Sequence, residues 1–167
     1  MACDSRVSDS GHTFVTRMPK IFRLPNKALL GCAGDADFRD VITLLSTATL
    51  KKLPTRAELA ATKCDFSGLL VFSDGSIFFI DIERPEQGSV AAEWTSSVLE
   101  SKERFAACGS GYQLALGAMA AGASAKQAVE IAARYDANTG APVVEVPLKP
   151  VEAPAKVKPK AKGEKHP

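Results

Sequence analysis

The sequence lacks the features of several large classes of protein. No apolar run approaches the roughly 20 residues that a membrane-spanning helix needs, and the first residues contain no apolar segment typical of a signal peptide. Histidine occurs only at positions 12 and 166, and the four cysteines form neither a CxxC pair nor a Cys/His spacing typical of zinc sites. We therefore expect a cytoplasmic protein with reduced thiols, no metal ion, no cofactor and no contact with a membrane.

The composition is that of an ordinary globular domain. Of the 167 residues, 46% are hydrophobic and 24% are charged, which is close to average usage and excludes a disordered chain, a collagen-like chain and a coiled-coil rod.

From Lys149 onward there are six lysines, two glutamates and no aromatic residue. We predict a domain over residues 1–148 and a disordered Lys- and Pro-rich tail over 149–167. Because no aromatic side chain stands among the lysines to stack on bases, we expect a solvated tail and no nucleic-acid binding.

Hydrophobic periodicity predicts clustered strands and paired helices. Strands are predicted over 13–24 (broken at Pro19), 27–33, 69–72, 77–82, 105–108 and 142–146. Helices are predicted over 36–50, 112–122 and 124–135, the last opened by a Ser124–Gln127 capping box. Asp74-Gly75 predicts a hairpin, and residues 84–104 give no clear signal. This order favours an α+β fold in which helices pack on antiparallel sheet.

Five short segments then stand in a recognisable order: Ala2–Ser8, Met18–Ile21, Leu30–Asp37, Ala107–Gly111 and Tyr135–Gly140. Together they resemble the family of proteasome β-subunits and bacterial HslV peptidases, which are N-terminal-nucleophile (Ntn) hydrolases. The resemblance covers about residues 2–146. It implies a four-layer αββα sandwich, and a threonine-type endopeptidase (a hydrolase) that degrades unfolded polypeptide. It also implies a homo-oligomeric ring and an ATP-dependent unfoldase as partner.

In that family an N-terminal threonine is the nucleophile and its own amine is the base, because an alcohol is inert at neutral pH without an adjacent proton acceptor. By resemblance, Lys20 matches the lysine that lowers the pKa of the hydroxyl, and Asp4 matches the orienting aspartate. Gly34 matches the glycine whose backbone N–H forms the oxyanion hole. Ser110 and Asp136 match the residues that support the terminal threonine.

The resemblance also suggests a substrate pocket, lined at the positions of Val7, Met18, Cys32 and Ala36. These side chains would make a small, mostly apolar pocket. The family's threonine heads a strand that precedes the aspartate, whereas only three residues precede Asp4 here. We therefore expect either that the threonine and its strand lie upstream of the printed sequence, or that the protein is a non-catalytic ring, shell or interaction component of the same fold. A small-molecule amidase is a third alternative.

Overall fold

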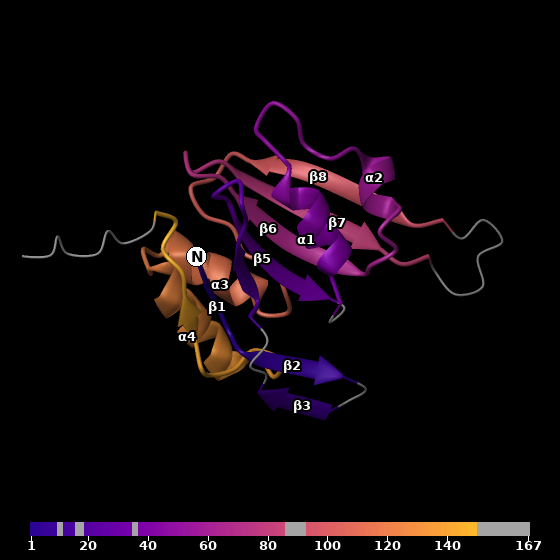
Figure 1. Ribbon diagram of the computed structural model, residues 1–167. Coiled ribbons are helices and arrows are strands. Elements are labelled where there is room, and N and C mark those ends of the chain that lie inside the picture. The colour runs from indigo at the N-terminus through magenta and orange to yellow at the C-terminus, as the bar shows by residue number, and fades with distance from the viewer. Residues whose placement is uncertain (10–11, 16–18, 35–36, 86–92, 150–167) are drawn as a thin grey trace, which may run out of the picture.

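The computed structural model describes residues 1–9, 12–15, 19–34, 37–85 and 93–149, which form a mixed α/β structure (Figure 1). A five-stranded antiparallel sheet has the order β4 (Ile21–Arg23), β5 (Leu29–Gly34), β6 (Phe66–Val71), β7 (Ile77–Glu83) and β8 (Thr95–Ser101). Two antiparallel ribbons pair β1 (Ala2–Cys3) with β9 (Val144–Glu145) and β2 (Arg6–Asp9) with β3 (His12–Val15). The helices are α1 (Arg39–Ser46), α2 (Arg56–Ala60), α3 (Tyr112–Ala120) and α4 (Ala125–Tyr135). The expected α+β class is confirmed.

The apolar segment that forms β5 lies inside the sheet, between β4 and β6. Leu29 and Leu30 are both fully buried although their side chains point to opposite faces, so both faces of β5 are covered. That is why the sequence shows a continuous apolar run and no alternation. The predicted hairpin is confirmed at the turn between β6 and β7. Gly75 in this turn has φ +96°, a conformation that glycine adopts without steric cost.

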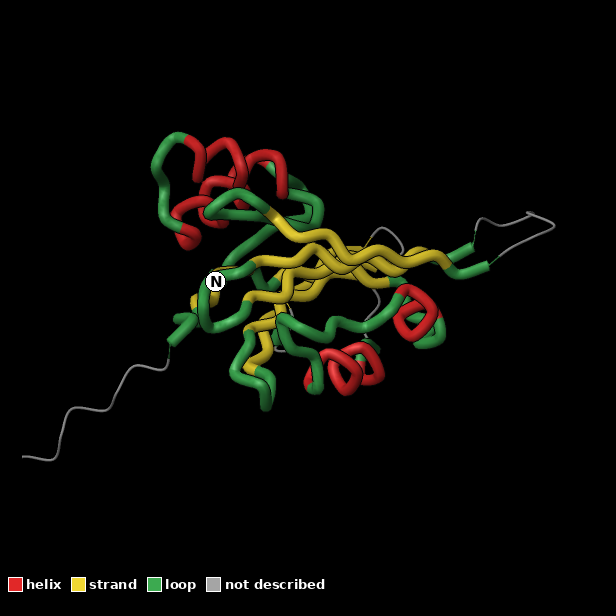
Figure 2. Tube along the Cα trace, turned by 90° about the horizontal axis from the view of Figure 1, so that it is seen from above, coloured by secondary structure: helices red, strands yellow, loops and turns green. Residues whose placement is uncertain are grey.

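The helices α1 and α2 cover one face of the five-stranded sheet. They bury Val41, Leu45 and Leu59 against sheet residues that include Phe78, Ile80 and Ile82. The capping box of α2 joins the Thr55 and Glu58 side chains to each other's backbone N–H groups, which fixes where this short helix begins. Seen from above, this helix pair lies on one side of the strands (Figure 2).

The helices α3 and α4 form an antiparallel pair on the other side of the strands (Figure 2). The turn between them is set by Gly122, with φ +96°, and by the predicted capping box of Ser124 with Gln127, which is confirmed. α4 packs on β1, and Met1 lies against Gly31 of β5, where an added Cβ would be 2.9 Å from the methionine sulfur. Met1 and β1 therefore join α4 to the five-stranded sheet.

One predicted strand is wrong, and one strand of the five-stranded sheet was not predicted. Residues 105–108 form no strand, because this apolar segment has no ladder partner among the described strands. The strand β8 arises instead from Thr95–Ser101, which pairs with β7 along its whole length. Of the predicted tail, only Lys149 lies among the described residues. No helix in the described ranges has the length and apolar character needed to cross a membrane.

Candidate active site

Asp4 and Lys20 meet in a partly buried ion pair. Asp4 follows β1, Lys20 precedes β4, and Lys20 Nζ donates to Asp4 Oδ1 at 2.7 Å. Lys20 Nζ also donates to the backbone carbonyl of Arg6. The lysine backbone is held in turn, because its carbonyl accepts the N–H of Cys32 in β5 at 2.8 Å. The ammonium group is therefore fixed by two acceptors and by the sheet behind it.

The second carboxylate oxygen of Asp4 reaches a different part of the chain. Asp4 Oδ2 accepts the N–H of Gly140 at 3.1 Å and the N–H of Arg6 at 2.9 Å. The N–H of Ser5 donates to the Gly140 carbonyl at 3.2 Å. Both oxygens of Asp4 are thus engaged, and the residue joins Lys20 to the loop that follows α4.

That loop carries a second polar group, centred on Asp136 at the end of α4. Asp136 Oδ2 accepts the Ser110 hydroxyl at 2.6 Å and the Thr139 hydroxyl at 2.5 Å. These hydrogen bonds, the one from Ser110 first, hold the pKa of the Asp136 carboxyl below its ordinary value, since they favour the charged form. Gly111 makes the approach possible, because a Cβ there would lie 2.7 Å from Thr139 Oγ1.

Gly34 lies at the exposed end of β5, next to the turn that leads to Ser110. Its φ is +112°, and an added Cβ would be 2.3 Å from the Asp65 carbonyl oxygen, so only glycine fits without distortion. The neighbouring Ala33 packs near Gly109, where an added Cβ would be 3.8 Å from the alanine Cβ. The residue before Gly34 therefore lies close to the residue before Ser110.

The predicted substrate pocket is described only in part. Met18 and Ala36 lie outside the described residues, and Val7 lies on β2 opposite Phe14. Cys32 is 7% exposed and belongs to the hydrophobic core. The geometry of the pocket stays a prediction.

The thiols near Lys20 are poorly suited to be nucleophiles. Burial raises the pKa of Cys3, and the Asp4 charge raises it further. Burial likewise raises the pKa of Cys32, and that of Cys108 to about 12. Because the thiolate is the reactive form, these cysteines are held in the unreactive state at neutral pH.

Within the part of the chain that the structure describes, no three His, Cys, Asp or Glu side chains are arranged to hold a metal ion.

Three residues of this site were missed by the sequence analysis: Arg6, Thr139 and Gly140. All three lie inside segments that carry the family resemblance. Thr139 follows Asp136 by three residues, a spacing that could have suggested a side-chain hydrogen bond across a turn. The contacts of Arg6 and Gly140 join segments more than 130 positions apart, and local sequence gives no signal for them.

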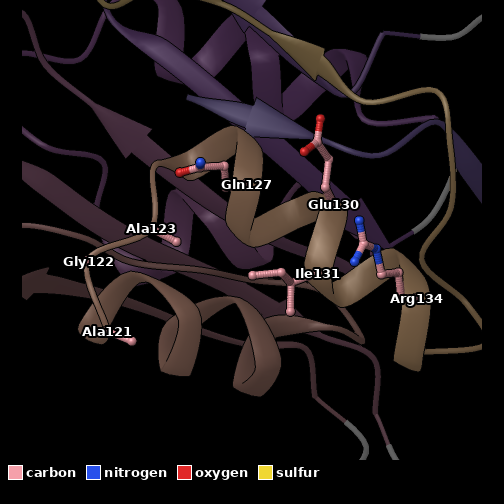
Figure 3. Close-up of a pocket in the computed structure, with 7 residues that line it drawn as sticks. All are labelled: Ala121, Gly122, Ala123, Gln127, Glu130, Ile131 and Arg134. Carbon is pink, nitrogen blue, oxygen red and sulfur yellow. The ribbon is translucent and has the colours of Figure 1, made fainter.

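A pocket of about 470 Å³ lies elsewhere, at the turn between α3 and α4 (Figure 3). It is lined by residues 121–123 and, on α4, by Gln127, Glu130, Ile131 and Arg134. None of these residues contributes to either hydrogen-bonded group described above. The candidate active site is therefore defined by its polar contacts and not by this pocket.

Comparison of the chain with models of known protein families finds no match, and comparison with curated proteins finds none either. The assignment of a function rests on the residues and the geometry of the site.

Proposed function

We propose that the protein is a subunit of a threonine-type endopeptidase of the proteasome-like Ntn-hydrolase class, whose attacking threonine heads a strand upstream of residue 1. One observation carries the proposal. The Lys20 ammonium is held by Asp4, and Asp4 is joined through Gly140 to the group formed by Ser110, Asp136 and Thr139. A fixed ammonium group, joined through one loop to hydroxyls that a carboxylate holds, supports a site that a threonine nucleophile could use.

The chemistry follows from these groups. The threonine hydroxyl would attack the peptide carbonyl carbon, and its proton would pass to the threonine's own amine and then to the leaving amine of the substrate. The Lys20 charge would stabilise the developing alkoxide, and the backbone N–H of Gly34 would donate to the oxyanion. Water would then hydrolyse the ester, releasing the acid and restoring the hydroxyl.

The arrangement of layers supports the same class. Helix pairs lie on both outer sides of the strands (Figure 2), and the β1–β9 ribbon is joined both to α4 and to the five-stranded sheet. From these features we propose the αββα sandwich that the resemblance implies. On that basis we further propose a homo-oligomeric ring in the cytoplasm, with unfolded polypeptide as substrate and an ATP-dependent unfoldase as partner.

The direct test is the variant Lys20→Ala, made in the gene product expressed with its upstream coding sequence. We expect peptide hydrolysis to fall by about 100-fold or more, as when a group that stabilises charge in the transition state is removed, while assembly is unchanged. Lys51→Ala is the matched control, since Lys51 is exposed in the α1–α2 connection. Unchanged turnover in Lys20→Ala would exclude the mechanism.

A second candidate is a non-catalytic ring, shell or interaction component. It is favoured by the contacts of Lys20, whose ammonium is hydrogen-bonded to Asp4 and Arg6 but to no Ser or Thr hydroxyl of the described residues. A subunit of this kind would keep the ion pair and the loop contacts as structural features only. It would assemble like the enzyme but would show no hydrolysis that depends on Lys20.

A further inference from the structure

Arg6 contacts both the Asp4–Lys20 pair and the loop that follows α4, and it does so through different atoms. Its backbone contacts the pair, because its N–H donates to Asp4 Oδ2 at 2.9 Å and its carbonyl accepts from Lys20 Nζ. Its side chain contacts the loop, because Nη1 donates to the Ala137 carbonyl at 2.7 Å. A single residue at the start of β2 thus spans the site.

The guanidinium group of Arg6 also lies close against Gly140. A Cβ added at Gly140 would lie 2.4 Å from Arg6 Nε and 2.6 Å from Cζ, so the side chain occupies the space that any larger residue would need. The fit requires both partners, a planar guanidinium on one side and a glycine on the other. A planar fork with several donors is the property that separates arginine from lysine.

These contacts hold opposite ends of one loop. At Gly140 the loop is held by Asp4 and Ser5. At Ala137, directly after Asp136, the backbone carbonyl accepts the hydrogen bond from Arg6. The positive charge also lies at the C-terminal end of α4, where it interacts favourably with the helix dipole.

We propose that Arg6 is a positioning residue that holds the loop from Asp136 to Gly140 against the Asp4–Lys20 pair, so that the two polar groups keep one relative geometry. The contact to the loop stands on the structure alone. Its importance for peptide hydrolysis rests on the proposed function.

The first test is hydrogen exchange of the full chain in the variant Arg6→Ala. We expect amides of residues 136–140 to exchange on the order of 10-fold faster, because a hydrogen bond from a charged donor is lost at one end of the loop. Arg23→Ala is the matched control. Arg23 also donates to distant backbone carbonyls, at Pro147 and Leu148. Because these carbonyls lie outside the loop, we expect Arg23→Ala to leave exchange at 136–140 unchanged. Equal exchange in Arg6→Ala and wild type would overturn the proposal.

The second test measures the pKa of Asp136 in the folded protein. This pKa reports the hydrogen bonds of the Asp136 carboxyl, and a general loss of stability does not change it. If Arg6 positions the loop, Arg6→Ala weakens the hydrogen bonds from Ser110 and Thr139, and the pKa of Asp136 rises toward its ordinary value. Arg6→Lys restores the charge but not the fork, and we expect an intermediate pKa. Carboxyl ¹³C titration by NMR measures it. A pKa unchanged in both variants would contradict the positioning role.

The third test is a double-mutant cycle with Gly140→Ala. The added methyl group displaces the guanidinium in wild type but meets no guanidinium in Arg6→Ala. The two substitutions should therefore be strongly non-additive in loop exchange; additive effects would contradict the contact.

The outcomes also separate the two proposals. If loop exchange responds as expected while Lys20→Ala leaves hydrolysis unchanged, Arg6 holds the loop but the proposed function is wrong. If hydrolysis depends on Lys20 but not on Arg6, the function stands and the positioning role fails.

Discussion

The two helix pairs of this protein pack against the strands in different ways. α1 and α2 bury large apolar side chains, namely Val41, Leu45 and Leu59. α3 and α4 bury only small ones, namely Ala115, Ala128 and Ala132. The first side is stabilised by apolar area removed from water, to which large side chains contribute most. On the second side, small residues let backbone and polar groups approach closely.

This difference separates the hydrophobic core from the candidate site. The α1–α2 side carries the hydrophobic core around Phe66 and Ile80. The polar contacts of the candidate site join the loop after α4 to Asp4 and to Ser110, and Asp4 in turn holds Lys20. We expect core substitutions to act on global stability, and site substitutions to act locally on geometry and charge. The predictions below test that division, from the largest expected effect to the smallest.

The largest effect is expected for Phe66→Ala. Phe66 is 1% exposed and packs edge-on against Phe38. Removing a fully buried ring should lower the free energy of unfolding by about 3–5 kcal/mol, measured by urea denaturation. Phe66→Leu is the control and should cost less than about 2 kcal/mol. Similar losses for both would show that packing on this side does not determine stability.

Gly34→Ala should have the next largest effect. The position combines φ +112° with a Cβ that would lie 2.3 Å from the Asp65 carbonyl oxygen, so we expect a loss of about 2–3 kcal/mol. Gly75→Ala is the control. It has φ +96° but open space around the added Cβ, and should cost about 1 kcal/mol. Equal losses in thermal unfolding would mean that the close approach at Gly34 has no energetic effect.

Asp4→Asn tests the ion pair of the site. The two side chains are 14% and 22% exposed, so removing the carboxylate leaves a partly buried ammonium without its charge partner, at a cost of about 1–2 kcal/mol. The exposed pair of Asp37 with Arg39 provides the control, Asp37→Asn, for which we expect a much smaller loss because solvent screens the pair. Chemical denaturation measures the free energy of unfolding of both variants. Equal losses would show that burial of the Asp4–Lys20 pair does not determine its contribution.

The smallest effect concerns pH and Asp136. A carboxyl whose pKa is lowered by folding stabilises the protein above its ordinary pKa, and that contribution disappears as pH falls through the folded value. We therefore expect Ser110→Ala to weaken the dependence of unfolding free energy on pH as the pH falls below the ordinary carboxyl pKa of 3.8, because it removes the first donor to Asp136. Identical pH profiles for variant and wild type would show that this hydrogen bond does not favour the charged form.

Local signals in the sequence were sufficient for most of the fold. The apolar run of β5, the Asp74-Gly75 turn and the Ser124 capping box each depend on neighbouring residues, and each was predicted. β8 was missed because Thr95–Ser101 is polar and becomes a strand only by pairing with β7. The prediction of a strand at residues 105–108 was wrong, because this apolar segment pairs with no described strand.

The site could be predicted only through the order of its segments. Asp4 with Lys20, and Ser110 with Asp136, were expected together by resemblance, and each pair is hydrogen-bonded. Their roles in catalysis stay predictions. Arg6 was missed because its contact with Ala137 joins residues 131 positions apart, and the charge of an arginine does not identify its acceptor.

The central claim is that the ammonium group at Lys20 serves a threonine outside the printed sequence. Its most direct test is the intact mass and N-terminal sequence of the mature protein, produced from the gene with its upstream coding sequence. The account predicts a chain that begins with threonine, at the head of a strand that precedes Met1. A mature chain that begins at Met1 or Ala2 would contradict it.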